Sequence, residues 1–382
     1  MKNINNCIKL LLAAMILLAY SSCRKDEKPI VGNVTTQPDF KPDPNSVVKG
    51  MYLLNEGNMN MNKASLDYLD FTTGKYHANI YNSANPTVVK SLGDVGNDIA
   101  VYGAKVYVVV NNSNLIEVLN VKTAKHIATI AIANCRNVVF HDNKAYISAY
   151  LGKVGDPNAP NGAVYEIDTT SLVITRKVTV GRQPEEMAIV GQKMYVANSG
   201  GYSPPNYENT LSVIDLGSFT EIKRIVVAIN LEKVKADQYG DLYVTSRGDY
   251  YKIPPDLYVV DTKTDQVKKD FKLPVSNLYI DGDTAYMYSV AFSYITGKNA
   301  ITYSMLDVKN EAILNKQFIT DGTDKQIAVP YGITVNPITK EVFVTDAKNY
   351  VTSGTVYCFD TSGKKEWSII AGDIPGHFAF SY

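Results

Sequence analysis

The stretch that decides the fold is Arg182–Ala228, which reads RQPEEMAIVGQKMYVANSGGYSPPNYENTLSVIDLGSFTEIKRIVVA. It contains four short apolar runs, at 184–190, 194–198, 211–215 and 221–227, and residues typical of turns separate them. Such runs predict four β-strands joined by turns and loops. Both faces of the resulting sheet are apolar, so we expect further sheets to pack against it.

Two sequence marks from this stretch recur along the chain. The first is an aromatic residue followed by aliphatic ones, and it begins at Tyr52, Tyr107, Tyr146, Tyr195, Tyr243, Tyr286 and Phe343. The second is an aliphatic residue followed by Asp or Asn, and it ends at Asp70, Asn120, Asp168, Asp215, Asp261, Asp307 and Asp360. Seven copies of a four-stranded unit at this period predict an all-β fold, a seven-bladed β-propeller. An Asp that precedes a turn can accept a hydrogen bond from the backbone two residues on, so we interpret these carboxylates as structural.

The first repeat lacks an opening strand. Segments 51–55, 65–71 and 76–81 supply three strands, and the missing one is expected at the other end of the chain, where Pro375–Phe380 matches Pro184–Ile189. We therefore predict that the C-terminal strand closes the ring, which also covers an exposed strand edge. The remaining blades are expected at 95–132, 134–180, 182–228, 230–274, 275–320 and 327–372.

The N-terminal region has the composition of a targeting segment. Lys2 and Lys9 precede or flank an apolar stretch that is too short for a resident membrane helix, and it ends at Ser21-Ser22-Cys23. We predict a lipoprotein signal peptide at 1–22 with Cys23 as the lipidated residue; an ordinary cleaved signal peptide is the alternative. Residues 23–48 carry four Pro and no apolar period, which predicts a disordered tether before the propeller at 49–382.

Composition narrows the classes of function. Lys plus Arg and Asp plus Glu balance at 38 each, and this balance argues against nucleic-acid binding, which favours a basic excess. Cys135 and Cys358 fall in the third and seventh blades, which are not neighbours in the ring. A disulfide requires Cα atoms within about 7 Å, so we expect two free thiols.

Catalytic and metal-binding motifs are missing from the sequence. There is no Gly-x-Ser-x-Gly, His-Glu-x-x-His or phosphate-binding Gly-rich loop, and there are only four His. Segments 281–283 and 321–324 resemble calcium loops but lack the further oxygen ligands, so turns are expected there. We predict no catalytic residue, no metal and no cofactor.

Alignment of the repeats places two rings of residues at one end of the central channel. Level with Glu186 lie Asp98, Asn137, Lys233, Asn277, Gly332 and His377. One position earlier lie Asn97, Arg136, Glu185, Glu232, Ser276, Tyr331 and Gly376. These rings are polar and mixed in sign, which suits either a binding site or a solvated channel wall.

The loops after the aromatic marks open on the same face; that of the second blade, Asn111–Asn114, is minimal, the others are long, and the loops on the other face are tight. They are rich in Tyr and Asn, and loops of this kind favour binding a bulky, neutral ligand rich in amides or hydroxyls. Packing of the loops on one another is the alternative. The candidate ligand-binding residues are Asn55, Asn58, Asp98, Arg136, Tyr150, Arg182, Glu186, Tyr202, Tyr207, Arg247, Tyr250, Tyr251, Asn277, Tyr294, Tyr331, Tyr350 and His377.

The Tyr-Val-Ala-Asn run at 195–198, the Val-Ile-Asp run at 213–215 and the ring closure resemble the YVTN/YncE-type seven-bladed propellers. The segments 55–58, 93–98 and 198–202, together with Cys23 and the Lys25-Asp26-Glu27 run, are similar to a branch of surface lipoproteins of Bacteroides-type bacteria. That branch includes proteins that capture vitamin B12 for an outer-membrane transporter. The resemblance implies a lipid-anchored protein of the outer membrane, facing the cell exterior, that binds a corrinoid and passes it to a transporter. A propeller that binds glycan, cell-wall material or a protein partner without catalysis is the alternative.

Overall fold

The computed structural model describes residues 33–382 except 89–90, 154–155, 157, 202–205 and 294–297, and all structural statements concern the described residues. The expected signal peptide, Cys23 and the candidate residues Tyr202 and Tyr294 lie outside them. The described chain forms one compact unit from residue 33 onward. None of its helices is both long and apolar enough to span a membrane.

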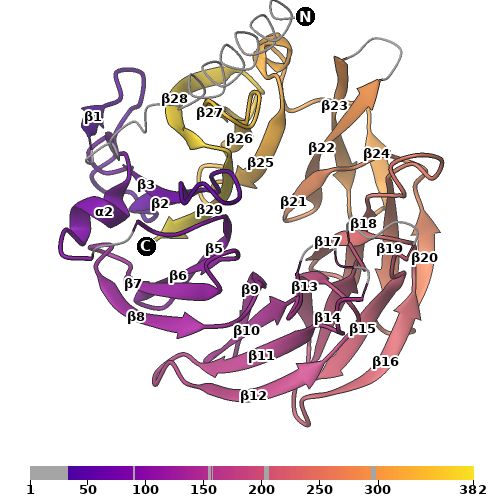
Figure 1. Ribbon diagram of the computed structural model, residues 1–382. Coiled ribbons are helices and arrows are strands. Elements are labelled where there is room, and N and C mark those ends of the chain that lie inside the picture. The colour runs from indigo at the N-terminus through magenta and orange to yellow at the C-terminus, as the bar shows by residue number, and fades with distance from the viewer. Residues whose placement is uncertain (1–32, 89–90, 154–155, 157, 202–205, 294–297) are drawn as a thin grey trace, which may run out of the picture. The chain divides into compact units, whose positions relative to one another are not determined.

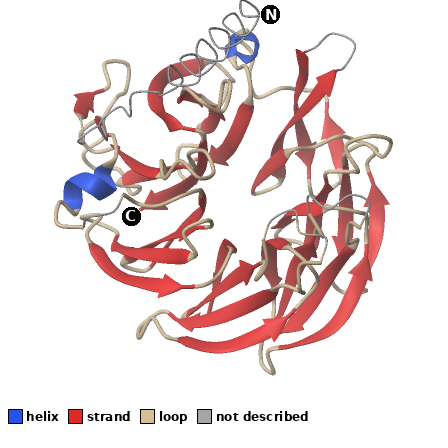
Figure 2. Cartoon of the chain, viewed as in Figure 1, coloured by secondary structure: helices blue, strands red, loops and turns tan. Residues whose placement is uncertain are grey.

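Seven antiparallel sheets follow one another around a central axis, so the fold is an all-β seven-bladed propeller, as predicted (Figures 1 and 2). Six of the sheets have four strands in chain order, from the inner to the outer edge. Blade 2 comprises β5 (Gly96–Tyr102), β6 (Lys105–Val110), β7 (Leu115–Asn120) and β8 (His126–Ala131). Blade 3 comprises β9 (Cys135–His141), β10 (Lys144–Ala149), β11 (Ala163–Asp168) and β12 (Ile174–Thr179). Blade 4 comprises β13 (Pro184–Val190), β14 (Lys193–Asn198), β15 (Thr210–Asp215) and β16 (Thr220–Val226). Blade 5 comprises β17 (Leu231–Ala236), β18 (Asp241–Ser246), β19 (Asp256–Asp261) and β20 (Gln266–Asp270). Blade 6 comprises β21 (Asn277–Asp281), β22 (Thr284–Ser293), β23 (Lys298–Asp307) and β24 (Ala312–Leu314). Blade 7 comprises β25 (Pro330–Val335), β26 (Val342–Asp346), β27 (Ser353–Phe359) and β28 (Lys365–Asp373).

Blade 1 is built from both ends of the described chain. Its strand order is β1 (Val34–Thr36), β4 (Lys75–His77), β3 (Ser65–Asp70), β2 (Gly50–Asn55) and β29 (Pro375–Ser381). The C-terminal β29 is the innermost strand and pairs with β2 from Gly50↔Ser381 to Asn55↔Pro375. In Figure 1 the yellow β29 lies beside the indigo β2. This pairing confirms the predicted closure of the ring.

The third segment of blade 1 differs from the strand expected at 76–81. The strand β4 ends at His77, and a short helix α2 (Ile80–Ala84) follows, with Tyr81 buried. Asn79 adopts a left-handed φ of 49°, which cannot continue a strand. Its backbone N–H donates to the buried carboxylate of Asp67 at 2.7 Å, so Asp67 stabilises the turn that ends the strand.

The tether expected at 23–48 is ordered from residue 33 to residue 48, so that prediction is wrong for this part. Strand β1 pairs with β4 through three residues whose side chains are all exposed. An open strand edge accepts another strand through backbone hydrogen bonds alone, without an apolar pattern. Phe40 then packs against Phe71 and Trp367, with ring centroids 5.6 and 5.8 Å away, and Val48 is buried.

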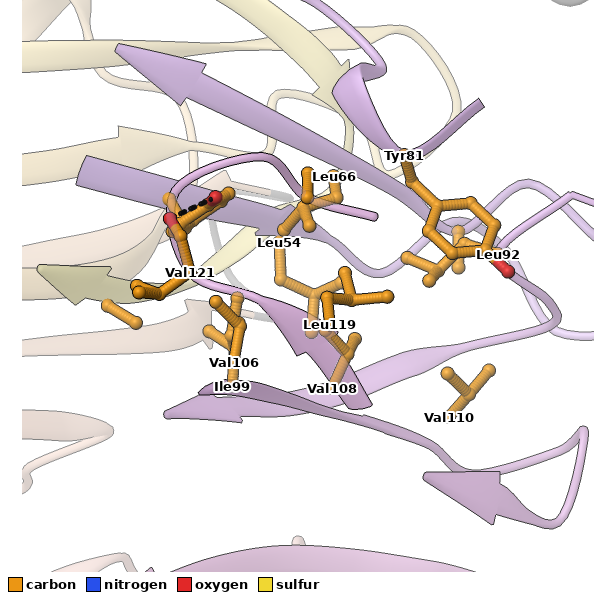
Figure 3. Close-up of a cluster of buried hydrophobic side chains, with 14 residues drawn as sticks. Leu54, Leu66, Tyr81, Leu92, Ile99, Val106, Val108, Val110, Leu119 and Val121 are labelled. Atoms are coloured by element: carbon orange, nitrogen blue, oxygen red, sulfur yellow. Dashed lines mark hydrogen bonds between the residues drawn. The ribbon is translucent and has the colours of Figure 1, made fainter. Parts of the chain in front are cut away.

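The core lies between neighbouring blades. Between blades 1 and 2, Leu54 and Leu66 pack with Ile99, Val106 and Leu119, all buried (Figure 3). Deleting a side chain of this kind costs about 2–5 kcal/mol. The two predicted free thiols, Cys135 and Cys358, are also buried and unpaired.

The repeated marks have clear physical roles. The hydroxyls of Tyr52, Tyr195 and Tyr243 each donate to a backbone carbonyl in the outer turn of the next blade, at Val121, Thr262 and Val308 respectively. The Asp or Asn of all seven second marks accepts a backbone N–H from the turn that follows it, as Asp215 does from Ser218 at 2.7 Å. The first mark therefore links blades, and the second shapes turns.

Removal of residues 377–382 should abolish cooperative thermal unfolding, because β2 then loses its inner partner and the ring opens. The matched control removes residues 1–36, which takes away only the exposed strand β1 from the described structure. We expect the melting temperature of that control to stay within about 4 °C of the full chain, since about 1 kcal/mol shifts a domain of this size by a few degrees. Scanning calorimetry of both variants checks this, and a C-terminal truncation that melts like the full chain would contradict ring closure.

Candidate functional site at one end of the channel

A cavity of about 670 Å³ lies at one end of the central channel and is called the mouth cavity below. All seven residues of the ring that begins at Asn97 line it, from Asn97 and Arg136 to Tyr331 and Gly376. Five residues of the second ring also line it: Asn137, Glu186, Lys233, Asn277 and His377. The repeat alignment therefore located this cavity correctly.

Two successive residues of one strand line the same cavity because the inner strands are irregular. The pairing of inner and second strands shifts register between Gly96 and Asp98 in blade 2, and between Leu231 and Val234 in blade 5. Similar shifts occur in blades 1, 3, 4 and 7. In a regular strand neighbouring side chains point to opposite faces, whereas a bulge inserts a residue and redirects a side chain.

Glu185 is the most strongly bonded carboxylate of the cavity wall. Its Oε2 accepts hydrogen bonds from Arg136 Nε at 3.1 Å and Nη2 at 2.9 Å, and its Oε1 accepts from Arg247 Nη2 at 2.8 Å and from the Tyr150 hydroxyl. The Arg136 guanidinium also lies 4.8 Å from the centre of the Tyr150 ring. Glu185 therefore joins residues of blades 3, 4 and 5.

Electrostatics keep Glu185 ionised although only 3% of its side chain is exposed. Burial alone would raise its pKa, but the two guanidinium groups of Arg136 and Arg247 outweigh burial and hold the pKa at about 2. If either partner were removed, the buried negative charge would be left partly uncompensated and the folded protein would be destabilised.

The second ring links inner strands of neighbouring blades. Glu186 accepts a hydrogen bond from Lys235 Nζ at 2.7 Å and from the Val234 backbone N–H at 2.8 Å. Asp98 accepts in the same way from the Val138 N–H at 2.9 Å, and burial raises the pKa of its carboxyl group. These carboxylates therefore hold blades together as well as lining or supporting the channel.

A third network lies where the ring closes. His377 Nε2 is 2.8 Å from Glu56 Oε1, and the Tyr331 hydroxyl donates to Glu56 Oε2 at 2.8 Å. The Tyr331 ring also meets the Tyr350 ring edge-on, at 6.0 Å between centroids. Asn58 Nδ2 donates to the Tyr350 carbonyl at 2.6 Å. Glu56 thus connects the long loop of blade 1 with β29 and blade 7.

Exposed apolar side chains lie on the loops that join the second and third strands of blades 1, 5 and 7, and each of these loops also contributes at least one residue to the cavity lining. The rim, as we call this set, consists of Met59, Met61, Tyr250, Tyr251, Ile253, Tyr350 and Val351. Tyr251 is 82% exposed. Large apolar groups gathered beside a cavity are typical of a binding surface.

The candidate residues fall into three groups. Asn58, Arg136, Glu186, Arg247, Asn277, Tyr331, Tyr350 and His377 line the mouth cavity. Tyr250 and Tyr251 belong to the rim, and Tyr207 lies on a neighbouring loop outside the lining. Asn55, Asp98, Tyr150 and Arg182 are engaged within the protein instead: Asn55 with Asp67, Asp98 with Val138, Tyr150 with Glu185, and Arg182 with Glu208.

Glu56, Met59, Glu232 and Lys233 also line the cavity and were not selected from the sequence as binding residues. Glu232 and Lys233 were placed in the rings by alignment, so a signal for them existed. Glu56 follows directly on the first aromatic mark, but its contacts with β29 join the two ends of the chain and follow only from ring closure.

In the described part of the chain, the one group of side chains that could hold a metal ion lies elsewhere. Glu341, Cys358 and Glu366 each place one ligand atom within 4.8 Å of the others, beside a second cavity of about 470 Å³ that Phe40 and Trp367 also line. Burial raises the pKa of the Cys358 thiol, and burial with the neighbouring Glu366 raises that of Glu341 to about 7. Protonated groups bind metal ions poorly, and we assign no ligand here.

Comparison with known proteins supports the fold and leaves the ligand open. Residues 49–380 match the family described as "Domain of unknown function (DUF5074)". A hypothetical selenium-binding protein from Sulfolobus tokodaii has a similar structure, with a TM-score of 0.64 and 12% identity over 90% of this chain and 97% of that one. A quinoprotein alcohol dehydrogenase-like protein from Bacteroides thetaiotaomicron shows a TM-score of 0.54 and 15% identity, covering 87% and 78%. Hydrazine synthase from Kuenenia stuttgartiensis shows a TM-score of 0.54 and 15% identity, covering 70% and 77%. No curated protein sequence matches the chain.

Glu185→Gln should destabilise the protein by about 3 kcal/mol at pH 7, because two guanidinium groups lose their shared anionic partner. A carboxyl pKa lowered from 4.5 to about 2 contributes stability above pH 4.5 that is lost as the pH falls through 2. The difference between wild type and Glu185→Gln should therefore shrink between pH 4.5 and pH 2, as measured by urea unfolding.

The matched control is Glu232→Gln, which changes a carboxylate of the same ring that forms no hydrogen bond in the described structure. We expect it to alter stability by less than about 0.5 kcal/mol. Equal effects of the two substitutions would contradict the assignment of Glu185 as the anchor of the network.

Proposed function

The chain belongs to the DUF5074 family, and we propose that its propeller captures a bulky, amide-rich small molecule, a corrinoid of the cobalamin class, at the mouth cavity. The observation that carries the proposal is the combination of a polar cavity with an apolar, tyrosine-containing rim. The role is binding without catalysis, followed by transfer of the ligand to an outer-membrane transporter.

The charges of the cavity wall favour an uncharged ligand. Most of its ionised side chains are already paired within the protein, as Glu185 is with Arg136 and Arg247, and Glu186 is with Lys235. A ligand with a net charge would compete with these pairs, and truncating or displacing one partner of a buried pair is costly. Amides, in contrast, donate and accept hydrogen bonds without carrying charge.

The size and the rim favour a ligand larger than the cavity. A volume of about 670 Å³ lies within the usual range for small-molecule sites, so the cavity can hold part of a corrinoid. The remaining part would contact the rim, where Tyr250, Tyr251 and Tyr350 offer large apolar faces with polar tips. A corrin ring is broad and flat and carries amides around its edge, and these properties match both parts of the site.

The docked N-terminal segment agrees with display from a membrane anchor. Residue 33 is held at the outer edge of blade 1, where the Ala78 backbone N–H donates to the Asn33 carbonyl at 3.2 Å. The inner strands of all seven blades contribute to the lining of the mouth cavity, and they lie at the opposite edge of the blades. We propose that Cys23, which lies outside the described residues, is lipidated and anchors the domain in the outer membrane with its mouth unobstructed.

Tyr350→Ala should weaken cyanocobalamin binding by more than about 1 kcal/mol, because an aromatic anchor beside the cavity carries much of the binding energy. The control is Tyr239→Ala, which removes an exposed Tyr from the turn between β17 and β18, at the other end of the propeller. This control should bind like the wild type in isothermal titration calorimetry. Wild-type protein without affinity at micromolar concentration would overturn the corrinoid assignment and favour a glycan, cell-wall or protein ligand.

Cys23→Ala should move the protein from the membrane fraction to the soluble fraction, because the acylated residue is lost. Fractionation of cells that express the wild type or the variant measures this. Protease added to intact cells should cleave the wild type before residue 33. Complete protection of the wild type would contradict surface display, and an unchanged membrane fraction for the variant would contradict lipidation.

A further inference from the structure

The hydrogen bonds of the two rings leave one pair of neighbouring side chains unused. At least one side-chain hydrogen bond within the protein is formed by each of ten ring residues: Asn97, Asp98, Arg136, Asn137, Glu185, Glu186, Ser276, Asn277, Tyr331 and His377. The other polar ring residues are Glu232 and Lys233, and neither side chain forms a hydrogen bond in the described structure. Their contacts are ion pairs at longer distances, 3.9 Å between Lys233 Nζ and Glu232 Oε1 and 3.7 Å between Arg247 Nη1 and Glu232 Oε1.

Both side chains are presented to the same space. They are consecutive residues of β17, and the register shift between Leu231 and Val234 allows both to line the mouth cavity. Their side chains are 25% and 16% exposed, so a ligand in the cavity can reach them. Burial would lower the pKa of Lys233, but the surrounding carboxylates, Glu186 first and Glu232 next, raise it, so the ammonium stays charged.

An ammonium beside a carboxylate offers three donors and several acceptor positions at adjacent points. A carboxylate or phosphate group of a ligand would accept from Lys233 but be repelled by Glu232. A ligand ammonium would meet the opposite problem. A carboxamide satisfies both, because its carbonyl oxygen accepts from Lys233 Nζ while its N–H donates to the Glu232 carboxylate.

We propose that Glu232 and Lys233 form a recognition site for an uncharged carboxamide group of the ligand. The inference rests on the proposed function and deepens it, because it names the chemical group that enters the cavity and the residues that bind it. A site built to bond an amide rejects the corresponding acid, because the acid leaves one partner unpaired and repels the other.

The main experiment compares cyanocobalamin with its separated monocarboxylic acids, in each of which one peripheral amide is hydrolysed. By calorimetry, at least one acid should bind the wild type about 10- to 100-fold more weakly than cyanocobalamin, as expected for loss of a hydrogen bond to a charged group. Glu232→Gln should narrow this ratio by removing the repulsive carboxylate. Lys233→Met should weaken binding of cyanocobalamin itself. Lys263→Met, an exposed position in the turn between β19 and β20, is the control and should leave the ratio unchanged.

Two results would overturn the inference while the proposed function stands. One is binding of every monocarboxylic acid within about twofold of cyanocobalamin. The other is a ratio that Glu232→Gln leaves unchanged although the variant still binds cyanocobalamin.

A second arm tests the inference without a corrinoid. Propionamide and propionate are titrated at millimolar concentration while the side-chain ammonium signal of Lys233 is followed by NMR, assigned with Lys233→Met. Propionamide should shift this signal, and Glu232→Gln should reduce the shift, whereas propionate should have the smaller effect. No shift with propionamide, or equal shifts with both compounds, would overturn the carboxamide site even if cyanocobalamin binds elsewhere on the face.

Discussion

The pairing of β29 with β2 is the interaction on which the rest of the structure depends. It joins the C-terminal strand to the first repeat over six residues of β2 and turns an open row of blades into a ring. It also completes the mouth cavity, because β29 carries His377 against Glu56, and Glu56 in turn accepts from Tyr331 of blade 7. The same event therefore removes two sheet edges and assembles the last part of the cavity wall. The pairing of β29 with β2 therefore closes the ring and also completes the wall of the mouth cavity.

Around this ring, ionised groups hold the blades in register while leaving little free charge for a ligand. Glu185 connects three blades through Arg136, Arg247 and Tyr150, and Glu186 reaches from blade 4 to Lys235 of blade 5. Such pairs are costly to desolvate, and removal of one partner is strongly destabilising because the other charge stays buried and uncompensated. Against this background, the weakly paired Glu232 and Lys233 differ from their neighbours, and our proposal that they recognise a ligand rests on this contrast.

The fold could be predicted from the sequence because its determinants are local and repeated. Each Tyr or Phe mark and each Asp or Asn mark sits in the same place in its blade, so seven weak signals reinforce one another, and Pro375–Phe380 could be matched to Pro184–Ile189.

The site could be predicted only in outline. Alignment placed the rings but not the bulges that bring two successive residues to one cavity. Asn55 donates a hydrogen bond to Asp67 and Arg182 donates one to Glu208, and these partners, distant in sequence, could not be predicted from the repeat pattern. Residues 33–48 contact blade 1 through backbone pairing of β1 with β4 and through the ring of Phe40. Such contacts require no repeated pattern of apolar residues, so the sequence carries no signal for them.

The central claim is that the loop-rimmed end of the channel, and not another surface, receives the ligand. Amide hydrogen exchange with and without cyanocobalamin measures this directly, because binding slows exchange where the ligand covers or rigidifies backbone. The account predicts added protection in loops 56–64, 247–255 and 347–352 and in the bulged part of β17, with the turns at the other end of the blades unchanged. Protection confined to those opposite turns, or to the segment docked at 33–48, would contradict it.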